Sequence, residues 1–374
     1  MKEKISALHS KYIIDGVQQD LTPAQVLDSV SLSASPSPVP DLIGKIVDET
    51  LEPSLGGVEL DTSRIDKYLS MVIRTSRKVP MQFADSFTRA RIETTLLDCI
   101  WRLGNFRLGD LELKADWEWN DSVIGNMAAF YASVDAAAEL VDALQVKFSE
   151  YSFEYTKGAS RLDFGAELRQ GPEPEELAET HYTTPSPRMG AASLPSTLVA
   201  DPKSWIVYIP FDTSLYRLGG SLLSQAAKLE APVAPSVNDP DYFIDCYEVV
   251  RELVEDGVVI SAATIKDGGL LAALKSMTGS RIGASIELSD LRAATGEDDI
   301  VRLLFAEVPG ALIQIRDIDF DYMDAELLLQ DVAFYPLGHP VPGSGAVRVH
   351  ASTKTGIQNI LDSLLMYQGA EGED

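Results

Sequence analysis

A stretch rich in proline, glutamate, serine and threonine, residues 171–200, interrupts a regular alternation of strand-like and helix-like segments. Strand-like runs occur at residues 161–168, 204–211, 258–265 and 332–338, and helical spacing of apolar residues marks 86–103, 126–144, 219–229, 242–257 and 270–277. Strands that alternate with helices on both sides of such a stretch predict an α/β (α+β) protein with two domains and an interdomain linker.

We therefore expect four regions. They are an N-terminal helical or linker segment (1–55), a first α/β domain (56–170), a linker (171–200) and a second α/β domain (201–374). In the first region, Thr22-Pro23 has the order of an N-cap followed by a first-turn proline, and the Ser/Pro-rich run at 33–40 opposes regular structure. A length of 374 residues is sufficient for two hydrophobic cores.

The charge balance excludes some classes of partner. Acidic residues number 57 and basic residues 31, which gives a formal net charge of −26. Nucleic acids and anionic membranes are bound largely through cationic side chains, so we expect neither as a partner. No signal peptide and no apolar run of about 20 residues is present, which predicts a cytoplasmic protein.

Few side chains suit catalysis or metal binding by their spacing. Cys99 and Cys246 lie in separate apolar stretches and are expected to be buried free thiols. The four histidines (His9, His181, His339 and His350) show no metal-ligand spacing and are expected to be solvated, His339 in a Pro/Gly-rich loop. The carboxylate run at 317–326 is expected to be a solvated edge strand or turn. We assign no catalytic residue.

Five segments, in order, carry a resemblance. They are RTSRKVPMQFADSFTRARIETTLLDCIW (74–101), LELKADWEWN (111–120), YRLGGSLLSQ (216–225), KDGGLLAALKSM (266–277) and VRLLFAEVPGALIQI (301–315). Together they resemble the aminoimidazole ribonucleotide (AIR) synthetase superfamily, and most of all the second synthetase half of phosphoribosylformylglycinamidine (FGAM) synthase. No glutaminase segment accompanies them, so no cysteine nucleophile for glutamine is expected.

The resemblance implies a fold and a mode of assembly. The N-terminal domain would be a mostly antiparallel α/β unit whose strands pair across a two-fold interface, and the C-terminal domain an α/β unit packed beside it. In the full-length enzyme the two halves pair with each other. We therefore expect either a homodimer or a pair with another synthetase-like chain.

The family activates an amide oxygen with ATP, and Mg²⁺ accompanies the triphosphate. Its metal ligands include a glutamate and an asparagine on one helix. If Trp101 anchors the alignment, these ligands fall on Thr94 and Asp98, and a register slipped by one places them on Glu93 and Leu97. The resemblance therefore leaves Glu93 and Asp98 as vestigial metal ligands.

Other family positions are also replaced. The first metal-binding aspartate falls near Gly57, the last falls on Thr264, and the serine of the metal loop falls on Lys266. The lysine and glycine of a further loop are missing from VKFSEYSFEYT (146–156). At most one or two of the four metal ligands are therefore retained.

The segments around the two Gly-Gly pairs define a vestigial cleft, formed by Gly219, Gly220, Lys266, Asp267, Gly268 and Gly269. Amides at helix N-termini bind anions, so the glycines could hold phosphate, or they could serve backbone packing. Lys266 could replace the metal charge and bind an anion, or it could pair with Glu93 or Asp98.

The resemblance and the replacements together predict function. The first hypothesis is a non-catalytic FGAM synthase relative that binds a partner chain or a purine-pathway metabolite and needs no cofactor. The alternative is an active ATP-dependent FGAM synthase or cyclo-ligase-type subunit that uses ATP and Mg²⁺ and is completed by another chain. The third is an unrelated binder of a nucleotide or phosphorylated metabolite that keeps the cleft.

Overall fold

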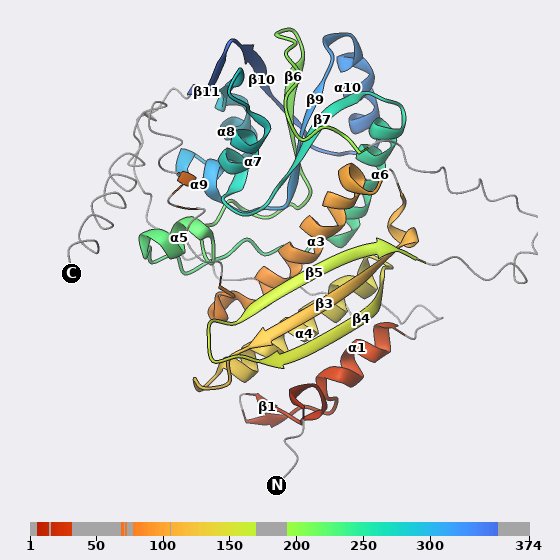
Figure 1. Ribbon diagram of the computed structural model, residues 1–374, viewed down its shortest axis with the longest axis vertical. Helices are drawn as coiled ribbons and strands as arrows, with labels where there is room; N and C mark the ends of the chain where they lie inside the picture. Colours follow the sequence, from red (N-terminus) through yellow and green to blue (C-terminus); the bar gives the residue numbers. More distant parts are fainter. Residues whose placement is uncertain are drawn as a thin grey trace, which may run out of the picture.

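The computed structural model describes residues 6–14, 16–31, 69–70, 72, 78–104, 106–169 and 193–350. Two larger sheets, a two-stranded hairpin and the helices between and around them make up the described part (Figure 1), which confirms the predicted α/β class. The domain bounds stay a prediction, because much of residues 1–78 and 170–192 lies outside the described residues.

The first sheet has three strands in the order β4-β3-β5, with bounds β3 (Leu111–Trp119), β4 (Lys147–Tyr155) and β5 (Arg161–Leu168). Strand β3 is antiparallel to β5 but parallel to β4, so this sheet is mixed, whereas the resemblance implied mostly antiparallel pairing. Strand β4 is formed by the segment where the resemblance placed a loop. Helices α3 (Ala84–Arg102) and α4 (Asn126–Ala143) lie against one face of the sheet (Figure 1).

The inner face of this sheet is apolar because every second residue of β3 points toward the helices. Trp117 and Trp119 lie on this face and are almost completely buried. The ring of Trp117 meets Phe130 of α4 edge to face at 6.3 Å, and its Nε1 donates a hydrogen bond of 3.0 Å to Ser133 Oγ. The pairing of Trp117 with Ser133 satisfies a polar group that burial would otherwise leave without a partner.

The opposite face, which we call the outer sheet face, carries mostly charged side chains. The register between the strands places the following residues on this face: Glu112, Lys114, Asp116, Glu118, Lys147, Glu150, Ser152, Glu154, Arg161, Asp163, Gly165 and Glu167. Seven of these are acidic and three are basic. Lys114 bridges Glu150 and Glu167 across all three strands.

Helix α1 (Pro23–Ser31) packs against α4 and β4 and begins as predicted. The amide of Gln25 donates to Thr22 Oγ1, and the amide of Thr22 donates to Gln25 Oε1, so the two residues cap the helix reciprocally. A short hairpin, β1 (Ile13–Ile14) and β2 (Val17–Gln18), precedes it.

The second sheet has six strands in the order β11-β8-β10-β6-β9-β7. Their bounds are β6 (Trp205–Pro210), β7 (Val259–Ile265), β8 (Ile282–Glu287), β9 (Gly310–Ile315), β10 (Tyr335–Pro342) and β11 (Ser344–His350). The helices of this part are α5 (Leu222–Ala227), α6 (Pro240–Glu255), α7 (Gly269–Met277), α8 (Ser289–Thr295), α9 (Ile300–Phe305) and α10 (Phe320–Leu329). Strand β8 and helix α8 had no counterpart in the sequence prediction.

Helix α3 joins the two parts, because it packs on the first sheet and on one face of the second (Figure 1). Its apolar residues share one hydrophobic cluster with α4, α6 and the inward-facing residues of β6, β7 and β9. Helices α7 and α9 cover the other face of the second sheet in a separate cluster. Residues of α3 that face the second sheet are therefore placed beside the ends of its strands.

Two local predictions were wrong. The carboxylate run at 317–326 forms a short 3₁₀ turn and most of α10, in which Met323 and Leu327 are buried one turn apart. His339 lies in β10, not in a loop, with its ring 4.2 Å from that of Trp205. No helix among the described residues is long and apolar enough to cross a membrane.

Candidate functional site

A polar stripe runs along α3 and faces the second sheet. Arg91, Thr94, Thr95, Asp98 and Arg102 recur every three or four residues, which places them on one side of the helix. Together with Phe164–Ala166 of β5 and with Lys266, they line a pocket of about 330 Å³, which we call the α3–β5 pocket. The predicted site residues Asp98 and Lys266 therefore meet in space.

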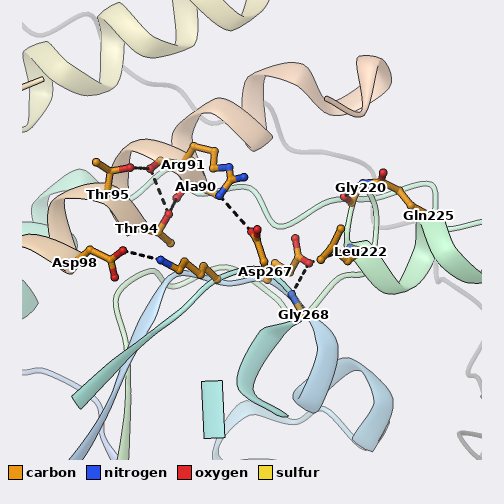
Figure 2. Close-up of polar contacts among 12 residues, drawn as sticks. Ala90, Arg91, Thr94, Thr95, Asp98, Gly220, Leu222, Gln225, Asp267 and Gly268 are labelled. Carbon is orange, nitrogen blue, oxygen red and sulfur yellow. Dashed lines mark hydrogen bonds and ion pairs between the residues drawn. The ribbon is translucent and has the colours of Figure 1, made fainter. Parts of the chain in front are cut away.

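Asp98 is the centre of a hydrogen-bond network in this pocket. Lys266 Nζ donates to Asp98 Oδ2 at 2.6 Å (Figure 2), and the hydroxyl of Thr264 donates to Asp98 Oδ1. The indole Nε1 of Trp101 donates to the Thr264 hydroxyl at 2.9 Å. Of the two roles considered for Lys266, the structure shows an ion pair, with Asp98 as the partner.

These groups do not fit the family's metal ion. Mg²⁺ requires oxygen ligands in near-octahedral geometry. Of the positions matched to the family's metal ligands, the described ones hold one carboxylate (Asp98) and two hydroxyls (Thr94 and Thr264), with the Lys266 ammonium beside them. The position near Gly57 lies outside the described residues. The Thr94 hydroxyl donates back to the carbonyl oxygen of Ala90. Over the described residues, no group of three or more His, Cys, Asp or Glu side chains could hold a metal ion.

Glu93 does not join Asp98. The two residues are five apart on α3, which corresponds to about 140° around the helix. Glu93 is completely buried, and neither carboxylate oxygen has a hydrogen-bond partner among the described residues. Burial, and then the nearby charges of Asp212 and Asp239, raise the pKa of Glu93 well above its usual range. Its environment favours a neutral carboxylic acid, not a metal ligand.

The two Gly-Gly segments converge on one carboxylate (Figure 2). Glu307 Oε1 accepts a hydrogen bond of 2.9 Å from the amide of Leu222, the first residue of α5. The same oxygen accepts a bond of 2.8 Å from the amide of Gly268, which caps α7. A side-chain anion of the protein itself thus occupies the amides that would otherwise be available to a phosphate.

The cleft beside these amides is small. Gly219, Gly220 and Glu307 line a cavity of about 40 Å³, whereas ligand pockets usually exceed about 300 Å³. A Cβ atom on Gly219 would lie 2.3 Å from the carbonyl oxygen of Val233, and one on Gly269 would lie 2.7 Å from that of Leu304. Both glycines are therefore required by close backbone packing, in line with the packing alternative. A wider open groove of about 680 Å³ starts at Gly220 and follows α5 toward Pro232.

Asp267, the remaining predicted residue, turns toward α3. Its Oδ1 lies 3.3 Å from Nη1 of Arg91, so a second ion pair links the helix to the loop that carries Lys266. Arg91 and Glu307 were not singled out from the sequence. The signal for Glu307 was present, because it is the glutamate of the family-like segment VRLLFAEVPG.

Comparison with known proteins gives a sequence match over part of the chain. No protein-family model matches the chain. Human phosphoribosylformylglycinamidine synthase is 24% identical over 217 residues, which cover 57% of this chain. The chain matches only 15% of the length of that relative.

Solved structures give weaker likenesses. PurLQS from Thermotoga maritima is 14% identical with a TM-score of 0.49, over 76% of this chain and 42% of that one. The hydrogenase maturation protein HypE from E. coli is 14% identical with a TM-score of 0.44, over 72% and 78%. On the sequence match and the ordered motifs that preceded it, the chain is related to FGAM synthase and thereby to the AIR synthetase-like superfamily.

Proposed function

We propose that this chain is a non-catalytic relative of the second synthetase half of FGAM synthase, which acts as a binding or assembly module. The observation that carries the proposal is the Lys266–Asp98 ion pair, which joins the two segments that the resemblance aligns with the family's metal loop and ligand helix. An ammonium group at that position repels a divalent cation and uses the carboxylate that would bind one.

The net charge of the chain and the amides already bonded to Glu307 also oppose ATP binding. A triphosphate brought to a chain with a formal charge of −26 needs a cation to offset the repulsion. The amides at the start of α5 and α7 already donate to Glu307. We therefore propose that the protein works without ATP and Mg²⁺, in the cytoplasm, paired with a second copy or with another synthetase-like chain.

The alternative, an active ATP-dependent subunit completed by another chain, makes the opposite prediction for nucleotide binding. We expect calorimetric titration of ATP or ADP, with and without Mg²⁺, to show no binding tighter than about millimolar, or roughly −4 kcal/mol. ATP binding that is tight only with Mg²⁺ would exclude the proposal and favour the active subunit. The variant Lys266→Ser restores the serine of the family's metal loop. Any weak effect of Mg²⁺ on nucleotide binding by wild type is compared with the effect in this variant.

A further inference from the structure

Helix α10 presents apolar side chains to solvent. Its inward side is filled by Met323 and Leu327, which are completely buried. The opposite side carries five exposed residues, which we call the α10 stripe: Ile318 in the turn before the helix, Tyr322, Ala325, Leu328 and Leu329. Ile318 is 86% exposed and Leu329 is 77% exposed. Contiguous exposed apolar groups mark protein interaction sites, whereas single ones need no explanation.

The neighbouring helix α6 places carboxylates beside this stripe. Helix α10 packs against α6 (Figure 1), and the Tyr322 hydroxyl donates a hydrogen bond of 2.7 Å to Oδ2 of Asp256 at the end of α6. That hydrogen bond, together with the nearby charges of Glu326 and Glu252, raises the pKa of Tyr322 to about 12. Tyr322 therefore stands at the boundary between an apolar surface and an acidic one.

Negative charge predominates over both helices. Residues 240–257 and 316–331 hold six acidic residues each, which makes 12, against two basic residues, Arg251 and Arg316. Arg251 forms ion pairs of 2.9 to 3.1 Å with three glutamates of α6: Glu248, Glu252 and Glu255. Arg316 pairs with Asp319 at 2.5 Å. One arginine offsets one of three glutamates in charge, so the exposed side of α6 stays acidic.

We propose that the α10 stripe and the acidic side of α6 form a docking surface for a basic amphipathic helix of a partner protein. The apolar side of such a helix covers the stripe, and its lysines or arginines face the carboxylates of α6. The proposal deepens the proposed function and rests on it in one respect, namely that the chain acts as a binding or assembly module.

Charge decides between this partner and the other candidates. A second copy that docks through the same surface about a two-fold axis sets two acidic surfaces against each other. An anionic membrane is repelled for the same reason. A purely apolar partner removes water from the carboxylates of α6 and supplies no cation in exchange. The ten residues of α10 extend about 15 Å, so a partner helix of about four turns is long enough to cover them.

The test is a fluorescence anisotropy titration of the full chain, without nucleotide, against a labelled peptide. The peptide has about 16 residues, with leucines on one side of the helix and lysines on the other. A scrambled peptide of the same composition tests the helical pattern, and a peptide with glutamate in place of lysine tests the charge. We expect the amphipathic basic peptide to bind about tenfold or more tightly than either one, and added salt to weaken its binding.

Variants of exposed residues locate the binding on the protein. Ile318→Ser and Leu329→Ser remove apolar contacts and should each weaken binding by about fivefold or more. Glu252→Gln removes one charge at the rim and should weaken it by about twofold to threefold. Ile124→Ser is the matched apolar control, because Ile124 is fully exposed in the loop before α4. Glu154→Gln is the matched acidic control, from the outer sheet face, whose residues include no apolar stripe.

Several results would overturn the proposal. They are the absence of peptide binding to the folded wild-type chain, equal binding of the scrambled peptide, and losses in the two control variants as large as those in the α10 variants. Circular dichroism confirms that each variant is folded. Tight Mg²⁺-dependent ATP binding contradicts the proposed function separately, and because the peptide titration contains no nucleotide, the two results are read independently.

Discussion

Replacing Glu307 with alanine is expected to lower the free energy of unfolding by about 3 to 5 kcal/mol, since hydrogen bonds to charged groups contribute about 1.5–3 kcal/mol each. The carboxylate accepts from the amides of Leu222 and Gly268, at the starts of α5 and α7. Both amides would lose their acceptor in a part-buried setting, and the packing of α7 against α9 would be loosened.

Urea unfolding of the two proteins, followed by circular dichroism, measures this difference. Glu307→Gln is the matched control, because both bonds go to the single oxygen Oε1 and an amide oxygen can accept them too. We expect the glutamine variant to lose less than half as much stability as the alanine variant. An alanine variant within about 1 kcal/mol of wild type would show that water replaces the carboxylate at these amides.

Replacing Glu93 with glutamine is expected to stabilise the protein at alkaline pH, by about 1.4 kcal/mol for each unit by which folding raises the pKa of the carboxyl group. Of the buried acids in this region, Asp212 accepts hydrogen bonds from Ser214 and from the amide of Asp239. Glu93 accepts none from the described residues and so carries the proton. Arg89 lowers its pKa, but less than burial and Asp212 raise it.

The pH dependence follows from the direction of that shift. The folded-state pKa of Glu93 is raised above the unfolded value of 4.5, so the folded protein retains a proton that the unfolded chain releases. Its contribution to stability is complete below the unfolded pKa and is lost as pH rises toward the folded pKa. The free energy of unfolding of wild type should therefore fall relative to that of Glu93→Gln as pH rises from the unfolded value into the alkaline range. Thermal unfolding across this range tests it, with the exposed Glu154→Gln as control, and parallel curves for wild type and Glu93→Gln would contradict the assignment.

The sequence contained enough to predict most of the helices and to give Lys266 an acidic partner on α3, either Glu93 or Asp98, of which the structure shows Asp98. The apolar period of α3 fixed which of its residues face inward, and the ordered segments indicated that the loop at 266–269 lies beside that helix. The register on α3 was left open between two alternatives. The structure places Thr94 and Asp98 together in the pocket, while Glu93 and Leu97 are buried elsewhere.

Other features depend on contacts that periodicity does not report. The run at 317–326 alternates aromatic and acidic residues like an edge strand, but the burial of Met323 and Leu327 favours a helix. The role of Glu307 arises from two amides about 40 and 85 residues away in the chain, as the bonds to Gly268 and Leu222 show. The parallel pairing of β4 with β3 likewise depends on α4, which connects the two strands and lets them run in the same direction.

The outer sheet face bears on how a second copy could approach. A two-fold contact places each patch against an identical patch, so seven acidic side chains would meet the same seven with only three basic ones on either side. Face-to-face self-association therefore carries a built-in electrostatic penalty that dissolved salt screens. A partner surface richer in lysine and arginine would not be repelled in this way. The outer sheet face therefore favours a different, more basic partner over a second copy of this chain.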